Sequence, residues 1–166
     1  MPAIEQSAGE LFRGLGDLSW IADEGNMRVE HHLELIRAGT SWVAAGPDGR
    51  PRGFLCAMLL PAALHIVELA VGLESQRQGV GRCLMEHAIC WAYSRRLSNI
   101  TLTTFRDLPW NGPFYSSLGF RVLSTQQIDA RLGRILCEEA MNGMPPHRRC
   151  AMRLDLHELP SPQHSR

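Results

Sequence analysis

A glycine-containing turn joins an apolar segment to an amphipathic helical pattern, and this junction constrains the fold more than any other part of the chain. Residues Leu64–Leu73 are largely apolar and rich in β-branched side chains, which predicts a buried strand. From Val80 onward the apolar residues recur at helical spacing. Because Gly79 and Gly81 lie where this helix begins, we expect a strand that runs through a tight turn directly into a helix.

Such a junction can bind a phosphate group. The N–H groups of a helix's first turn and the positive end of its dipole point at a ligand placed there, and glycine lets that ligand approach the backbone. Arg77 and Arg82 would add charge-assisted contacts. The segment contains neither the P-loop pattern nor the dinucleotide fingerprint. These residues alone leave two interpretations open, a pyrophosphate-binding turn and an ordinary strand-to-helix turn.

The remaining pattern predicts a mixed α/β fold. We expect a helical region over Leu11–Ala38, interrupted at Gly14, Gly16 and Gly25 and stopped by Gly39. A capping box at Ser124 and Gln127 is expected to begin the last helix. The expected strands are Ser41–Ala45, Gly53–Leu60, Leu64–Leu73, Ile100–Phe105, Phe120–Leu123 and Cys150–Leu156, and the later helices are those from Val80, over Asn111–Leu118 and over Ile128–Met141. This order predicts one sheet with helices on both faces.

Composition narrows the class of protein. The 166 residues are 45% hydrophobic and 20% charged, with a net charge of +0, so we expect one globular domain over 1–166 with a loose tail at 159–166. Without a basic block, nucleic-acid binding is not expected. Pro61 and Glu68 interrupt the apolar stretch that could suggest a membrane span, which instead predicts two strands. With no signal peptide and five scattered cysteines, we expect a cytoplasmic protein; Cys83 and Cys90 should share a buried helix face.

Two motifs together resemble the GNAT superfamily of N-acetyltransferases. Gln76, Gly79 and Gly81 match the family's pyrophosphate motif in order, and Tyr115 followed by Gly119-Phe120 matches its later signature. One expected helix and one expected strand separate the motifs, as in the family. The resemblance covers about 53–123, where it implies an acetyl-CoA-binding core. It implies a mixed, mostly antiparallel sheet in which one pair of strands splays apart.

The resemblance also implies which residues bind acetyl-CoA. Backbone groups of Leu69, Ala70 and Val71 would pair with the pantetheine arm, and one N–H there would polarise the thioester carbonyl. The pyrophosphate would bind the segment formed by Gln76, Arg77, Gln78, Gly79, Val80, Gly81 and Arg82. Asn111 either contacts the pantetheine or caps its helix, and capping is the favoured role. The family's usual proline near Leu73 and acidic residue at Gly72 are absent, as is its usual first strand.

Two residues are candidates for proton transfer. The resemblance implies that Tyr115 protonates the departing CoA thiolate, and the alternative is a core aromatic residue. Glu68 is the first candidate for a general base, because burial in an apolar strand would raise its pKa. A structural pair with an arginine is the alternative for Glu68, His65 is a second candidate base, and water could also carry the proton.

The acceptor site is expected beside the first helices and the later strands, with no metal. Asp107 would hold a cationic amine and Trp110 would pack on it, unless these residues simply form a capped turn. The candidate lining residues are Trp20, Trp42, Phe105, Arg106, Asp107 and Trp110. We predict acetylation of a primary amine of a small molecule, with a possible homodimer. A protein or peptide N-acetyltransferase and a non-catalytic acyl-CoA sensor are the alternatives.

Overall fold

The computed structural model describes residues 1–24 and 27–158, and these form two compact units. The first unit comprises Met1–Leu59 and Ile66–Ile89, and the second comprises Leu60–His65 and the chain from Cys90. Strand β3 (Ala63–Val71) and helix α3 (Val80–Ser94) each contribute residues to both units. The expected loose tail at 159–166 and the interruption at Gly25 lie outside the described residues.

The N-terminal region is helical, as predicted, but its boundaries differ. Helix α1 spans Pro2–Gly9, two 3₁₀ segments follow at Glu10–Phe12 and Gly16–Asp23, and α2 spans Val29–Arg37. The expected start at Leu11 is therefore wrong. Pro2 at the first turn has a backbone angle that already suits a helix, which allows α1 to begin at once. Gly39 follows α2 with a φ of +70°, consistent with its predicted role as a stop.

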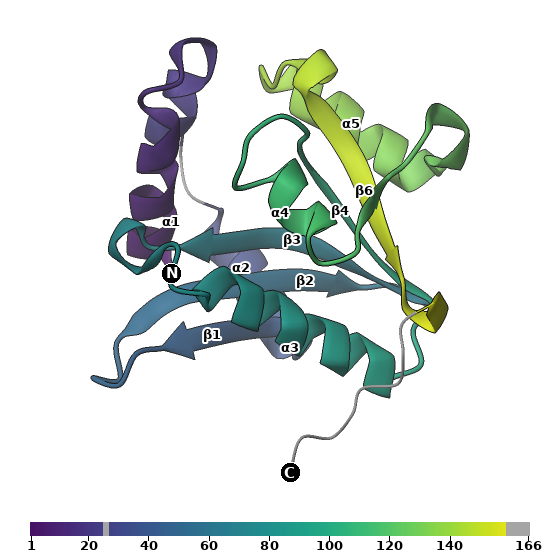
Figure 1. Cartoon of the computed structure of the whole chain (residues 1–166), viewed down its shortest axis with the longest axis horizontal. Coiled ribbons are helices and arrows are strands. Elements are labelled where there is room, and N and C mark those ends of the chain that lie inside the picture. The colour runs from purple at the N-terminus through teal and green to yellow at the C-terminus, as the bar shows by residue number, and fades with distance from the viewer. Residues whose placement is uncertain (25–26, 159–166) are drawn as a thin grey trace. The chain divides into compact units, whose positions relative to one another are not determined.

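A hairpin forms the first part of the sheet and separates two apolar faces. Strands β1 (Ser41–Ala45) and β2 (Pro51–Leu59) are antiparallel, so that Trp42 pairs with Leu55 on one face and Val43 with Phe54 on the other. Helices α1 and α2 pack on the Phe54 face, where the buried cluster is Leu35, Phe54, Cys56 and Ala70. On the opposite face the ring of Trp42 meets His87 of α3 at 5.7 Å. Figure 1 shows α3 in front of this hairpin and α2 behind it.

The second unit is built around an antiparallel ladder. Strand β4 (Asn99–Phe105) pairs along its whole length with β6 (Arg149–Asp155), and the short β5 (Arg121–Val122) pairs with the other edge of β6. The beginning of β3 pairs with β4 in parallel, with a register limited to Ala63–His65 against Asn99–Thr101. Two strands that separate after their first residues would form a short ladder of this kind.

The helices of this unit form where they were predicted, but their ends differ. Helix α4 spans Gly112–Ser116 and α5 spans Ala130–Met141, so α4 is shorter than predicted at both ends and α5 begins two residues later. The capping box of Ser124 and Gln127 is present, but it encloses a 3₁₀ turn at Thr125–Gln127 rather than starting α5. Helix α5 begins later because the Asp129 carboxylate accepts a hydrogen bond from the Leu132 N–H at 2.8 Å, which makes Asp129 the cap.

Hydrogen bonding joins the strands in the order β1-β2-β3-β4-β6-β5, so the predicted mixed and mostly antiparallel sheet is confirmed. The apolar stretch near Pro61 forms two strands, as predicted. No helix in the described residues is long and apolar enough to cross a membrane. Cys83 and Cys90 are exposed, which corrects the expectation that they are buried; they lie on the outer side of α3. The five cysteines are free thiols.

Candidate active site

The turn between β3 and α3 has the geometry that its glycines predict. After β3 ends at Val71, a 3₁₀ segment at Leu73–Ser75 leads into the turn, where Arg77 and Gly79 have φ values of +59° and +82°. The Cys83 N–H donates to the Gly79 carbonyl oxygen at 2.9 Å. The amides of Val80 and Gly81 precede this bond, so they belong to the first turn, whose N–H groups have no acceptor within the helix. They are suited to an anionic ligand.

Side chains near the turn hold its shape. Gln76 Nε2 donates to the Val71 carbonyl oxygen at 3.1 Å, and Gln78 Nε2 donates to the Glu74 carbonyl oxygen at 2.8 Å. The Leu73 N–H donates to Ser7 Oγ of α1 at 2.9 Å. The conformation of the turn is therefore fixed by its own side chains and by α1, and this use of Gln76 is visible only in the structure.

Next to the turn, the backbone of β2 closely approaches the end of β3. A Cβ atom on Gly53 would be only 2.9 Å from the Ala70 carbonyl oxygen and 3.1 Å from Val80. The Gly72 N–H donates to the Arg52 carbonyl oxygen at 2.9 Å, which extends the contact between β2 and the end of β3. Gly53 was not among the predicted site residues. Nothing in its local sequence distinguishes it from an ordinary strand glycine, because the constraint comes from residues distant in the chain.

Glu68 lies half-buried in the first unit, in an acid–base cluster with two buried residues. Its carboxylate, the carboxylate of Glu5 in α1 and the imidazole of His32 in α2 each place an atom within 4.8 Å of the others. Burial, followed by the charge of Glu5, raises the pKa of Glu68 to about 8. The predicted alternative, an arginine partner for Glu68, is not found among residues 1–24 and 27–158.

Glu5 and His32 form a tight pair inside this cluster. Glu5 is 8% exposed and His32 is 4% exposed. His32 Nε2 and Glu5 Oε1 are 2.6 Å apart, and Glu5 Oε2 accepts the Met27 N–H at 3.0 Å. Cys56 Sγ lies 3.8 Å from His32 Nδ1. The prediction missed both residues, because only the packing of α1 and α2 on β3 brings them to Glu68.

Tyr115 lies in the second unit, within α4. It is 8% exposed, and its ring packs against Phe114 at 5.1 Å and Phe120 at 5.9 Å. Asn111 holds the N-cap position, as favoured in the prediction, but its side chain forms no capping hydrogen bond. A Cβ atom on Gly112 would lie 2.5 Å from the Arg106 carbonyl oxygen, so α4 begins in direct contact with the chain after β4.

His65, the second candidate base, has surroundings different from those of Glu68. In the second unit His65 Nδ1 lies 3.0 Å from Thr101 Oγ1, which also accepts a hydrogen bond from Arg131 at 3.1 Å. Burial, and then the charge of Arg131, lowers the pKa of His65 to about 4. A histidine with this pKa is a weak base, so the arrangement favours Glu68 over His65.

The predicted acceptor residues fall in both units. Trp20 and Trp42 belong to the first unit, and Trp42 contacts His87 of α3. Phe105, Arg106, Asp107 and Trp110 belong to the second unit. There the Asp107 carboxylate accepts a hydrogen bond from Arg148 Nε at 2.7 Å, so its charge already has a partner.

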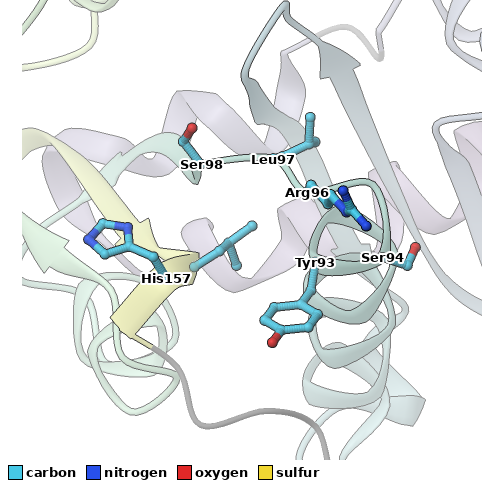
Figure 2. A pocket seen from close by; sticks show the side chains of 7 residues that line it. Tyr93, Ser94, Arg96, Leu97, Ser98 and His157 are labelled. Carbon is cyan, nitrogen blue, oxygen red and sulfur yellow. The ribbon is translucent and has the colours of Figure 1, made fainter.

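A pocket of about 550 Å³ lies at the C-terminal end of α3, at the opposite end of this helix from the turn (Figure 2). Its wall comes from the last turn of α3, the connection to β4 and the segment after β6. The lining residues are Tyr93, Ser94, Arg96, Leu97, Ser98, Leu156 and His157. None of the predicted site residues is among them.

Comparisons with known proteins agree with the fold. At 18% identity and a TM-score of 0.63, the chain resembles N-acetylglutamate synthase from Neisseria gonorrhoeae, solved with coenzyme A and N-acetyl-glutamate; the match covers 80% of this chain and 29% of that one. PaiA N-acetyltransferase from Thermoplasma acidophilum, in complex with coenzyme A, matches at 15% identity and 0.62, over 92% and 88%. The Escherichia coli ribosomal-protein-S18-alanine N-acetyltransferase matches at 19% and 0.51, over 72% and 70%.

The sequence itself identifies the family. The model of the acetyltransferase (GNAT) family matches residues 7–120, which is more than half of the chain and includes both the turn after β3 and Tyr115. The two motifs that carried the resemblance therefore lie within one family match. The chain belongs to the GNAT family of acetyltransferases.

Proposed function

We propose that this protein transfers the acetyl group of acetyl-CoA to the primary amine of a small molecule. The observation that carries the proposal is the turn after β3, whose first helical amides follow Gly79 in a left-handed conformation. Amides in that position bind pyrophosphate. Solved relatives in complex with coenzyme A support the choice of donor.

The donor would bind along the end of β3 and the start of α3. Backbone groups of Leu69, Ala70 and Val71 are assigned to the pantetheine arm, as the family resemblance implies. The segment from Gln76 to Arg82 is assigned to the pyrophosphate, with Gln76 holding the turn through Val71. The close packing of Gly53 on Ala70 supports this assignment, because it keeps the end of β3 rigid.

Glu68 and Tyr115 are assigned to proton transfer. Glu68 takes a proton from the acceptor ammonium, and the free amine attacks the acetyl carbonyl carbon to form the C–N bond. When the C–S bond breaks, Tyr115 gives its proton to the CoA thiolate and regains one from the new amide nitrogen. The proton on Glu68 passes to solvent, so the products are the acetylated amine, CoA thiol and one proton.

A small-molecule acceptor is supported by the near-neutral composition of the chain. The names of the similar structures differ widely in what they acetylate or bind: an N-acetylglutamate synthase solved with N-acetyl-glutamate, a ribosomal-protein-S18-alanine N-acetyltransferase, and nourseothricin acetyltransferase, which shares the fold at a TM-score of 0.53. A peptide α-amine is therefore the competing acceptor, and a panel that contains both classes separates them.

The first experiment is calorimetric titration of the protein with acetyl-CoA. One-to-one binding that is lost in Gly81→Trp is expected, because the bulky side chain occupies the space beside the first-turn amides. An amine panel monitored by thiol release then identifies the acceptor. The chain contains no lysine, so acetyl-lysine formed in a peptide reaction can only come from the peptide. No binding at millimolar acetyl-CoA would reject the proposal, and binding without turnover would indicate a sensor.

A further inference from the structure

Proton transfer by Glu68 alone does not explain why Glu5 and His32 lie beside it. The three side chains of this cluster come from α1, α2 and β3 of the first unit, and their polar atoms lie within 4.8 Å of one another, with Glu5 and His32 buried and Glu68 half-buried. Burying two carboxylates side by side is unfavourable unless hydrogen bonds or protons compensate the charge. The negative charge of the two carboxylates must therefore be compensated by hydrogen bonds or by a bound proton.

The two carboxylates of the cluster differ in their hydrogen bonding. Both oxygens of Glu5 are hydrogen-bonded, Oε1 to His32 Nε2 and Oε2 to the Met27 N–H, which donates. The other ring nitrogen of His32, Nδ1, faces the Cys56 thiol. Glu68 has no hydrogen bond or ion pair to the residues that the structure describes. Both oxygens of Glu5 are thus engaged in hydrogen bonds, whereas the Glu68 carboxylate is left available to exchange a proton.

The other titratable groups around the cluster do not alter this difference between Glu5 and Glu68. Cys56 on β2 faces His32, and burial raises the pKa of its thiol, so it remains protonated. The Met1 amino group and the carboxylates of Glu5 and Glu68 are the charges that act on that thiol. Within the described residues, Glu5 is the charged group that acts on Glu68.

We propose that Glu5 and His32 are positioning residues that act through Glu68: His32 holds the Glu5 carboxylate beside Glu68, and the Glu5 charge makes Glu68 a stronger base toward the acceptor ammonium. This inference rests on the proposed function, because it assigns a role within acetyl transfer. A carboxylate strengthened in this way is better matched to the proton of an alkylammonium than an ordinary glutamate is. Glu5 and His32 need not touch either substrate.

A cation could also be held by two carboxylates and an imidazole. The geometry favours the proton-transfer arrangement, because the 2.6 Å separation of His32 Nε2 and Glu5 Oε1 is that of a hydrogen bond. An ionised carboxylate can only accept, so when Glu5 is ionised the nitrogen in that bond carries the proton and has no lone pair for a metal. The two possibilities are separated by measuring the metal content of the purified protein.

The test compares variants that remove the charge with variants that keep it. Glu5→Gln retains a donor and an acceptor but loses the charge. His32→Leu removes the hydrogen bond that holds the Glu5 carboxylate beside Glu68, whereas His32→Gln keeps a donor. Glu30→Gln, at an exposed position of α2, is the matched control.

Two readouts are recorded for each variant, the pH profile of kcat/KM and the carbon-13 NMR titration of Glu68 in the free protein. We expect Glu5→Gln and His32→Leu to move the acid limb and the Glu68 titration to lower pH by about one unit, the effect of a lost neighbouring charge. His32→Gln and Glu30→Gln should resemble the wild type. Because Glu5→Gln removes the charge and His32→Leu releases the side chain that bears it, failure of one to fold leaves the other as the test.

The outcomes separate the inference from the proposed function. An unchanged acid limb and unchanged Glu68 titration in active Glu5→Gln and His32→Leu would overturn the inference and leave acetyl transfer standing. A wild-type protein that binds acetyl-CoA but acetylates no amine would overturn both. A stoichiometric metal that is lost in Glu5→Gln and restores activity when added back would replace the positioning role with a metal site.

Discussion

The hydroxyl of Tyr115 can be tested with little disturbance of its surroundings, because the ring packs against Phe114 and Phe120. Tyr115→Phe keeps these contacts and removes only the proposed proton donor. We expect kcat to fall by about 10²-fold, the lower range for general acid catalysis, with acetyl-CoA affinity nearly unchanged. Thiol release and calorimetry measure the two quantities. A wild-type kcat would show that Tyr115 serves packing alone.

Glu68 should set the pH dependence of the reaction. The base acts as the carboxylate, and its pKa of about 8 means that kcat/KM of the wild type should rise as the pH increases toward 8 and then level off. In Glu68→Gln this acid limb should disappear and the plateau should fall by about 10²-fold or more. Initial rates between pH 6 and pH 9 provide the measurement. If Glu68→Gln keeps the acid limb, the limb belongs to another group.

At the residue scale, sequence reasoning could find part of the site. Glu68 stood out because a carboxylate in an apolar strand is unusual, and Tyr115 stood out through the family signature. Glu5 and His32 could not be found in this way, because both belong to ordinary polar patterns on helices and gain their environment only when α1 and α2 pack on β3. Gly53 and Gly112 escaped for the same reason, since distant backbone atoms limit the space beside them.

The turn after β3 offers a matched pair of glycine substitutions. Gly79 and Gly39 both have a positive φ, +82° and +70°, and a Cβ atom on either would meet nothing within 4 Å. Alanine should therefore cost each about 1–2 kcal/mol of backbone strain and no steric clash. If the turn binds acetyl-CoA, Gly79→Ala should also weaken binding, whereas Gly39→Ala should not.

Thermal unfolding and calorimetric titration of both variants provide the comparison. Equal losses of stability with a selective loss of acetyl-CoA affinity in Gly79→Ala would support the turn as the binding element. Equal effects on affinity would mean that Gly79 influences binding only through general stability.

At the scale of elements, the strands were more predictable than the first helices. Strand β1 matches its prediction at both ends, because Gly39 and the turn at Pro47–Gly49 bound it on either side. The N-terminal region lacked such boundaries, and the helical interpretation there began at Leu11 rather than Pro2. The capping box was recognised correctly but stops after one 3₁₀ turn, since the extended backbone at Ile128 and the cap at Asp129 restart the helix.

The pH dependence of folding is a property of the whole molecule, and two buried groups act on it in opposite directions. The folded pKa of Glu68 lies near 8 and its ordinary value is 4.5, so the folded state holds an extra proton between them and stability falls as the pH rises through this window. His65 has a folded pKa of about 4 against 6.5, so its unfolded state holds the extra proton and stability falls as the pH drops from 6.5 toward 4.

The two slopes cancel between about pH 4.5 and 6.5, so we expect greatest stability from these two groups in that range and a decline as the pH rises from 6.5 toward 8. Glu68→Gln should raise the unfolding temperature relative to the wild type at pH 8 more than at pH 5. His65→Gln removes the opposing contribution, so its stability should rise as the pH drops from 6.5 to 4.5, where the wild type stays nearly level. Calorimetric unfolding at these pH values measures both. Parallel stability curves for wild type and variants would show that neither group titrates differently on folding.

The dependence of Glu68 on Glu5 and His32 also has an evolutionary consequence. Three positions far apart in the chain share one charge balance, so a substitution at one alters the selective value of the other two. Among homologues, a neutral residue at the position of Glu68 should coincide with relaxed positions 5 and 32, and lineages that retain Glu68 should rarely exchange Glu5 alone. The three sites should therefore covary as a group, which an alignment deep enough to include divergent members would reveal.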